Sequence, residues 1–146
     1  MLIPGSLGAI QQDVTTCCSI NCTAKLGFGS ANIINIFSKI NVEISTDMDI
    51  GEMMNEGNDK IIIEAVSTST TTAIAYGKCD ETNLKIKKRA EVILRMLVPY
   101  RDNLYVIGDG RGRSRFSPMY SKIRNGWELV KLYKDEQKET KNSKKV

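Results

Sequence analysis

The stretch DETNLKIKKRAEVILRMLVP, residues 80–99, decides the fold because it carries the clearest helical pattern in the chain. Apolar side chains recur there at the three- and four-residue spacing of a buried helical stripe, namely Ile86, Ala90, Ile93, Leu94 and Leu97. Basic residues occupy the other faces, and a proline at position 99 ends the pattern. The spacing predicts a helix over Asp80–Val98 with Ile93 in the core.

Two more helices are predicted on the N-terminal side of this stretch. Thr46 and Asp49 form a capping-box pattern for a short helix that Gly57 would end. The following residues predict a helix that runs to Tyr76 with one apolar face. The hydroxyl-rich run 67–72 has poor helix propensity, so a pair of strands over residues 61–76 remains the alternative.

The C-terminal side is more ambiguous. Residues 104–107 predict a short strand that leads into the glycine-rich loop GDGRGR, residues 108–113. A Ser-Pro pair then favours a helix over residues 119–133. Asn125-Gly126 favours a hairpin in the same place, and we prefer the helix. Residues 134–146 are polar and rich in lysine, as expected of a flexible basic tail.

These patterns predict a small, mainly helical domain with a few short strands and extended N- and C-terminal arms; an α+β fold is the alternative. Residues 1–30 are rich in glycine and small side chains, which predicts an extended arm with room for one short helix. Residues 31–133 would form the single core domain, with a strand at residues 41–45. The tail would begin at residue 134.

The composition of the chain excludes several classes of enzyme and of site. A chain of 146 residues with 41% apolar and 6% aromatic residues predicts one domain with a mostly aliphatic core. Because it has no histidine, it cannot form a Ser–His–Asp triad, a Cys–His dyad or an HExxH zinc site. The start of the sequence lacks the basic region of a signal peptide, and no apolar run would span a membrane. We therefore expect a protein that is not an enzyme and is not secreted.

The metal-ligating residue types do not occur at the spacings of known sites. The cysteines Cys17, Cys18, Cys22 and Cys79 lack the paired spacing of a zinc ribbon and are expected to be free thiols. The acidic residues around position 50 miss the order of a calcium loop, which requires glycine where this chain has Glu52. The sequence thus predicts neither a metal nor a cofactor.

Charge is divided unevenly along the chain. Residues 1–77 carry three basic and eight acidic side chains, whereas residues 78–146 carry eighteen basic and nine acidic ones. Such a division favours contact with a polyanion or head-to-tail contact between copies, unless the charges mix in the folded molecule. Nucleic-acid or partner contact is predicted for Arg111, Arg113, Arg115, Lys85, Lys88 and Arg89. A subunit interface is predicted for the acidic residues Asp47, Asp49, Glu52 and Glu56.

The middle of the chain also resembles a known family. The order of a short acidic helix, a helix ending in AIAYG and the basic LKIKKRAEVILRML helix is similar to that of head–tail connector (adaptor) proteins of tailed phages. Matching places are Tyr76-Gly77, Leu84-Lys85, Lys88-Arg89-Ala90, Tyr100-Arg101 and, loosely, Trp127-Glu128-Leu129. The pattern covers about 80 residues and contains no diagnostic motif, and the first 45 residues depart from it.

The resemblance implies a ring-forming structural protein of the virion, without catalytic residues. Its expected partners are other copies of the chain, the portal and tail proteins, and the DNA backbone. Its expected location is the virion or the cytoplasm of the host cell. A small basic nucleic-acid-binding module is the alternative function.

Overall fold

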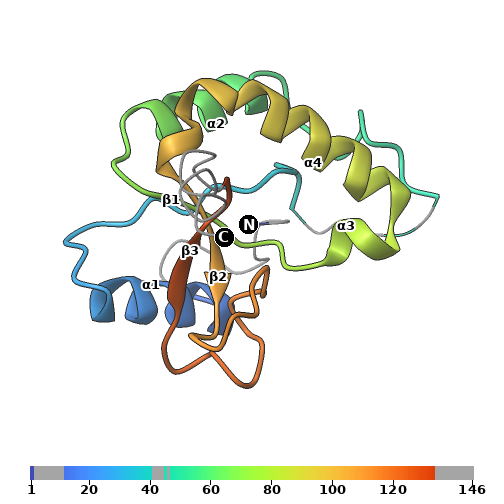
Figure 1. Ribbon diagram of the computed structural model, residues 1–146. Helices are drawn as coiled ribbons and strands as arrows, with labels where there is room; N and C mark the ends of the chain where they lie inside the picture. The colour runs from blue at the N-terminus through green and yellow to red at the C-terminus, as the bar shows by residue number, and fades with distance from the viewer. Residues whose placement is uncertain (2–11, 41–44, 46, 134–146) are drawn as a thin grey trace, which may run out of the picture.

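The computed structural model describes Met1 and residues 12–40, 45 and 47–133. Within these residues five helical segments and a three-stranded mixed sheet follow in the order α1, α2, β1, α3, α4, η1, β2, β3 (Figure 1). The predicted class, a small and mainly helical domain with a few short strands, is therefore confirmed. No helix in the described ranges is both long enough and apolar enough to cross a lipid bilayer.

Helix α4, Leu84–Met96, is the helix predicted from residues 80–99, but it begins later than expected. The side chain of Asn83 accepts hydrogen bonds from the backbone nitrogens of Lys85 and Ile86, so Asn83 caps α4 and separates it from the short helix α3, Cys79–Thr82. Ile93 is 2% exposed, which confirms its predicted place in the core. A 3₁₀ helix, η1 (Val98–Asn103), follows α4.

Helix α2, Asn58–Ser67, is shorter than predicted, and the helix expected to reach Tyr76 is wrong in its second half. The hydroxyls of Ser67 and Ser69 donate to the carbonyl oxygens of Glu64 and Ala65, at 2.8 and 2.6 Å. These bonds satisfy the last turn of α2, and the chain then forms strand β1, Thr72–Ile74. The alternative, a pair of strands over residues 61–76, is therefore right only in that one strand, β1, forms in the second half.

The short helix predicted over residues 46–57 is wrong. Residues 47–56 form turns and irregular backbone, and the Asp49 carboxylate accepts a hydrogen bond from Gly51 N at 2.7 Å, which closes a local turn there in place of a helix cap. Gly57, with a φ of 83°, precedes α2 rather than ending a helix. The segment still contributes to the core, since Met48 and Met53 are buried.

The predicted strand at residues 104–107 is confirmed as β2, Leu104–Gly108, whereas the helix predicted over residues 119–133 is wrong. Strand β3, Glu128–Lys131, pairs antiparallel with β2, and β1 pairs parallel with β2 on its other side. A strand does follow Asn125-Gly126, but it pairs with β2 and not with the residues just before the turn. Backbone pairing with β2 therefore makes residues 128–131 a strand.

Helix α1, Val14–Lys25, lies within the predicted N-terminal arm, where room for one short helix was expected. The Asp13 carboxylate caps it by accepting a hydrogen bond from Thr16 N at 2.9 Å. The Cys18 thiol and the Lys25 ammonium bond to carbonyl oxygens of the connection between β2 and β3. The predicted strand at residues 41–45 and the tail at 134–146 lie outside the described residues, apart from Ser45, which has no regular structure.

The core lies on both sides of the sheet. Helices α2 and α4 lie together on one side, and α1 lies on the other side beside the long connection between β2 and β3 (Figure 1). Leu104 of β2 packs into the larger apolar cluster with Ile62, Ile93 and Leu97, whereas Ile107 packs with Ala75 and Ile123. This arrangement leaves the segment before Ile36 facing β1 across a hollow region.

Candidate functional site

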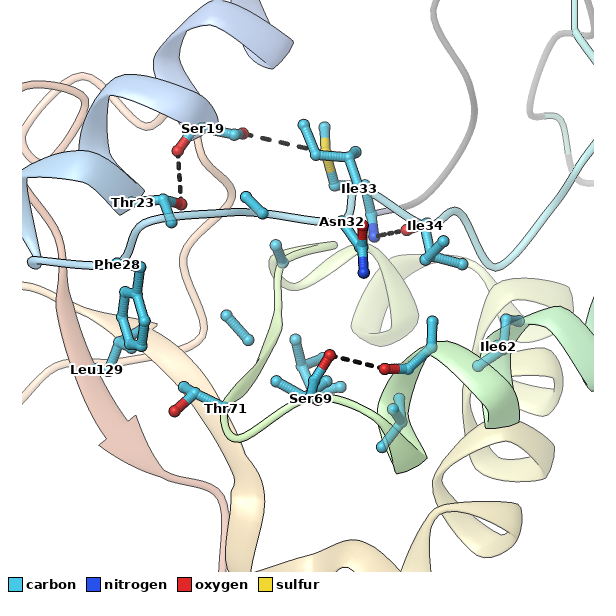
Figure 2. Close-up of a pocket in the computed structure, with 18 of the residues that line it drawn as sticks. Ser19, Thr23, Phe28, Asn32, Ile33, Ile34, Ile62, Ser69, Thr71 and Leu129 are labelled. Atoms are coloured by element: carbon cyan, nitrogen blue, oxygen red, sulfur yellow. Dashed lines mark hydrogen bonds between the residues drawn. The ribbon is translucent and has the colours of Figure 1, made fainter.

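The most prominent concave feature is a cavity of about 510 Å³. Its walls are helix α1, residues 28–36, the end of α2, the connection from α2 to β1, and β1 itself (Figure 2). Trp127 and Leu129 also line it. Cavities of this size in proteins commonly hold small ligands or parts of partner molecules. It is therefore the first candidate for a functional site.

The described lining of the cavity carries no lysine, arginine, aspartate, glutamate or cysteine. It consists of aliphatic, aromatic, amide and hydroxyl side chains together with backbone. Several of the hydroxyls are already used as donors within α1: Ser19 donates to the Thr15 carbonyl oxygen at 2.8 Å. Thr23 donates to the Ser19 carbonyl oxygen, also at 2.8 Å (Figure 2). The side chains of the described lining therefore offer apolar contact and neutral hydrogen bonds. The lining also includes the amino group of Met1, which donates a hydrogen bond to the Ile34 carbonyl oxygen at 2.6 Å and whose pKa is lowered by burial to about 6.

Two polar atoms of the lining are buried without a partner among the described residues. They are Oδ1 of Asn35, an acceptor, and Nε1 of Trp127, a donor. A buried polar atom that lacks a hydrogen bond costs about 1–3 kcal/mol, so native proteins rarely retain one without a reason. A bound group with one donor and one acceptor would remove this cost.

Tyr76 carries the one titratable side chain of the described lining, and the amino group of Met1 is a second titratable group there. Burial, followed by the nearby Asp80 carboxylate, raises the pKa of Tyr76 to about 12. The phenol therefore keeps its proton at neutral pH and cannot act there as a general base. Its hydroxyl remains a neutral hydrogen-bonding group.

The predicted arginine loop lies at the carboxyl end of β2 and is organised by Asp109. The Asp109 carboxylate accepts hydrogen bonds from the backbone nitrogens of Arg111 and Arg113, at 3.0 and 3.1 Å. It also forms an ion pair with the Arg113 guanidinium at 2.6 Å. Although desolvation opposes it, this set of donors lowers the pKa of Asp109. Gly110 and Gly112 supply the positive φ angles of this turn. The loop thus already holds an anion, its own carboxylate.

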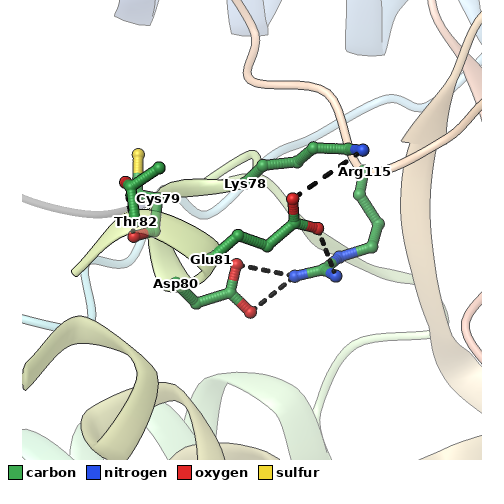
Figure 3. A network of polar contacts seen from close by, with 6 residues as sticks. All are labelled: Lys78, Cys79, Asp80, Glu81, Thr82 and Arg115. Carbon is green, nitrogen blue, oxygen red and sulfur yellow. Dashed lines mark hydrogen bonds and ion pairs between the residues drawn. The ribbon is translucent and has the colours of Figure 1, made fainter. Parts of the chain in front are cut away.

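Arg115 continues the loop and is bound to the acidic start of α3. Its guanidinium contacts the Asp80 carboxylate at 2.6 Å and Glu81 at 3.1 Å, while Lys78 lies 3.9 Å from Glu81 (Figure 3). The backbone of Arg115 has a φ of 65°, unusual for a residue with a side chain. Two of the three predicted contact arginines are therefore neutralised within the molecule, and Arg111 is the one without an acidic partner among the described side chains.

The basic residues predicted as contact residues on α4 have different environments in the structure. Lys88 is exposed as expected, whereas Lys85 Nζ bonds to the carbonyl oxygen of Met48. Arg89 is only 3% exposed and contacts Asp59 and the Ile36 carbonyl oxygen, at 2.6 and 2.9 Å. The prediction of Arg89 as a surface contact residue is therefore wrong, because its guanidinium is enclosed by the core.

The acidic residues predicted as an interface, Asp47, Asp49, Glu52 and Glu56, are all exposed. They lie on the turns that Lys85 of α4 contacts through Met48. The acidic and basic halves of the sequence therefore meet within one chain, which weakens the argument for charge pairing between copies. Cys17, Cys18, Cys22 and Cys79 are free thiols, and the described part of the chain holds no cluster of three or more metal-ligating side chains.

Sequence patterns did not predict the cavity. A usable signal exists in retrospect, since neither residues 26–37 nor residues 65–76 include a charged side chain. Two uncharged runs that are separated in sequence can enclose an uncharged space when they lie side by side. Their proximity depends on the fold, so the pattern alone does not place them together.

The protein family described as "Protein of unknown function (DUF1643)" matches residues 1–119. This chain belongs to that family. The DUF1643 match includes α1, α2, β1, α4, β2 and the arginine loop, whereas β3 and Trp127 lie beyond it. Most of the cavity wall is therefore part of the DUF1643 region. Comparisons with curated proteins and with solved structures give no match.

Proposed function

We propose that this protein is a binding subunit, not an enzyme, and that its cavity receives an uncharged group of a partner. The observation that carries the proposal is a cavity of about 510 Å³ that is lined by uncharged side chains and has two buried polar atoms without a partner among the described residues, Asn35 Oδ1 and Trp127 Nε1. A large apolar cavity with a few converging polar groups is the usual form of a binding site.

The energetics support an occupant. The cavity is open to solvent, so an occupant gains by removing apolar wall from water, at about 25 cal/mol per Å² of apolar surface. Water can fill the polar parts of the space, but it gains little against aliphatic walls such as those of Ile62, Val66 and Leu97. A fitting apolar group would stabilise the folded protein.

The lining also favours binding over catalysis. General acid–base or nucleophilic chemistry uses a titratable or activated side chain within reach of the reacting atom. The described lining has two titratable groups: Tyr76, whose pKa of about 12 keeps the phenol protonated, and the amino group of Met1, whose pKa burial lowers to about 6 and which is held by its hydrogen bond to the Ile34 carbonyl oxygen. The arginine loop is held by its own carboxylates, so it offers Arg111 alone as an unpaired guanidinium.

The ring-forming connector role remains a hypothesis from sequence resemblance. The resemblance relied on helices at residues 46–57 and 119–133, which the described residues do not form. The nucleic-acid-binding role relied on basic residues of which Arg89 is buried and Arg113 and Arg115 are paired. A binding subunit is the part of the sequence-based expectation that the geometry supports.

Benzene provides a direct test, because apolar cavities in proteins take up benzene. We expect benzene in the buffer to raise the melting temperature of the wild type by about 2–5 °C. The chain has one tryptophan, Trp127, and it lines the cavity, so its emission reports occupancy at the same time.

The matched variants are Ala65→Phe, which fills the cavity from α2, and Ala24→Phe, which adds the same side chain to the exposed face of α1. The first should abolish the response to benzene, and the second should retain it. The proposal fails if benzene changes neither the melting temperature nor the Trp127 emission of the wild type.

A further inference from the structure

We infer that the thiols of Cys18 and Cys22 form a binding site for Cu(I), in which the ion is held between the two sulfur atoms as a bis-thiolate complex. The site lies on the face of α1 that contacts the connection between β2 and β3, and neither cysteine lines the cavity. The inference therefore goes beyond the proposed binding function and does not depend on it.

The fold brings the two thiols together. Cys18 and Cys22 are four residues apart on α1, so their side chains lie on the same face of the helix. Both thiols donate to one acceptor, the carbonyl oxygen of Arg124, with Sγ–O distances of 3.1 Å for Cys18 and 3.5 Å for Cys22. Burial raises the pKa of Cys22, and so do the nearby Cys18 thiolate and its hydrogen bond with Cys22. The two sulfur atoms therefore converge on one point, where both can contact the same ion.

The helical spacing favours a metal bridge over a disulfide. Both cysteines are free thiols in the structure. Cβ atoms four residues apart on a helix are separated by about 5–6 Å, whereas a disulfide requires about 3.5–4.5 Å. A metal ion between the sulfur atoms adds two metal–sulfur bonds, each of which is about 2.3 Å long in the case of zinc. Such a bridge spans the wider separation without unwinding α1.

The number and type of the ligands select the ion. Thiolates are soft ligands, which favour Cu(I), Zn²⁺ and iron–sulfur clusters. Structural zinc takes four ligands and iron–sulfur clusters are held by four cysteines, but the part of the chain that the structure describes holds no cluster of three or more His, Cys, Asp or Glu side chains. Cu(I) is the ion of this group that two thiolates hold alone, because a soft monovalent ion is stable in linear coordination. The spacings of zinc sites in the sequence therefore gave no sign of it.

The surroundings provide access and a compensating charge. A hollow of about 260 Å³ is lined by Cys18 and by Met119, whose thioether is a further soft donor. Cys18 is half-buried and Cys22 is 1% exposed, so the ion enters from the side of Cys18. Binding releases both thiol protons to the solvent and leaves a complex with a net negative charge. The Lys25 ammonium lies near enough to favour the Cys22 thiolate and offsets this charge.

The test is competition for Cu(I). The reduced protein is added, without oxygen, to the coloured complex of Cu(I) with bicinchoninate, and loss of the colour measures transfer of the metal. We expect about one Cu(I) to bind per chain and about two protons to be released, which a pH indicator in weakly buffered solution measures. Zn²⁺ added in equal amount should not displace the Cu(I).

The matched variants are Cys18→Ser and Cys17→Ser, which make the same change at adjacent positions of α1. Cys18→Ser retains a hydroxyl donor for the Arg124 carbonyl oxygen, so we expect it to fold, and its melting temperature checks this. Loss of an outer partner of a metal ligand typically lowers affinity about 10–100-fold, so loss of Cys18 itself should lower it at least about 100-fold. Cys17→Ser and Cys79→Ser should keep the affinity of the wild type.

The outcomes that overturn the site are distinct. A wild type that takes no Cu(I) from bicinchoninate has no such site. Equal losses in Cys17→Ser and Cys18→Ser would assign the metal to the adjacent pair of thiols and reject the pair on one helical face. Cys22→Ser should lose affinity as Cys18→Ser does, and a folded Cys22→Ser protein with wild-type affinity would also reject the site.

Discussion

The buried ion pair between Arg89 and Asp59 offers a sharp test of the packing described above. The Arg89 side chain is 3% exposed and that of Asp59 is 46% exposed, with 2.6 Å between Arg89 Nη2 and Asp59 Oδ1. Arg89 Nε also donates to the Ile36 carbonyl oxygen, which in addition accepts a hydrogen bond from Asn58 Nδ2 at 3.1 Å. We therefore expect the removal of Asp59 and the removal of Arg89 to lower the free energy of unfolding by different amounts.

Asp59→Ala leaves a buried guanidinium without its carboxylate. Breaking a fully buried pair from one side costs about 3–5 kcal/mol, and a hydrogen bond to a charged group contributes about 1.5–3 kcal/mol. Because Asp59 is half exposed, water can reach part of the vacated position, so we expect a loss of about 2–3 kcal/mol in the free energy of unfolding. Arg89→Met removes the buried charge, and the Ile36 carbonyl keeps its bond from Asn58, so we expect a loss of about 1–2 kcal/mol.

Urea unfolding of the two single variants and of the double variant measures these values. The double variant should be more stable than the sum of the single losses predicts, since Asp59→Ala costs little once the buried charge is gone. Glu64→Ala is the control, because it removes an exposed carboxylate from the same helix and should change stability by less than about 0.5 kcal/mol. An additive cycle, or a loss below about 0.5 kcal/mol for Asp59→Ala, would refute the reasoning.

Two further predictions concern the carboxyl edge of the sheet. The pKa of Tyr76 is raised to about 12, so the folded protein keeps a phenol proton that the unfolded chain loses near pH ~10, and stability should be complete below that pH and fall as the pH rises toward ~12. In Tyr76→Phe the unfolding free energy should fall less between about pH 8 and about pH 11 than it does in the wild type. An equal fall in both proteins would contradict the raised pKa of Tyr76. Arg115→Gly and Arg115→Ala both remove the ion pairs, but only glycine adopts a φ of 65° freely, so thermal unfolding should find the Gly variant more stable by about 1 kcal/mol. Equal stability would mean that the left-handed backbone is not strained.

Local patterns in the sequence predicted the elements whose structure depends on near neighbours. The stripe that includes Ile86 and Ile93 determines helix α4, because helical hydrogen bonds and side-chain contacts join residues three and four apart. Strand β2 was predicted from its run of apolar and β-branched residues. The Asn83 cap could have been foreseen as well, since Asn is a preferred residue at the start of a helix.

The candidate site was predicted less completely. The arginine loop is at the predicted place, but its pairing with Asp109 and with Asp80 depends on residues that approach only in the folded chain. The basic stripe on α4 gave no sign that Arg89 faces inward, because a guanidinium tolerates burial only when a carboxylate and a carbonyl oxygen are supplied from elsewhere. The cavity was missed entirely.

The sequence by itself determined the fold class, helix α4, strand β2 and the exclusion of histidine chemistry, because these depend on composition or on short-range spacing. Only the tertiary structure decided that residues 72–74 and 128–131 are strands, since a strand is stabilised by the neighbour with which it pairs. It also decided that two uncharged segments, residues 28–36 and 68–76, face each other across an open space. That space is produced by long-range packing, and no local pattern encodes the distance between segments that are far apart in the chain.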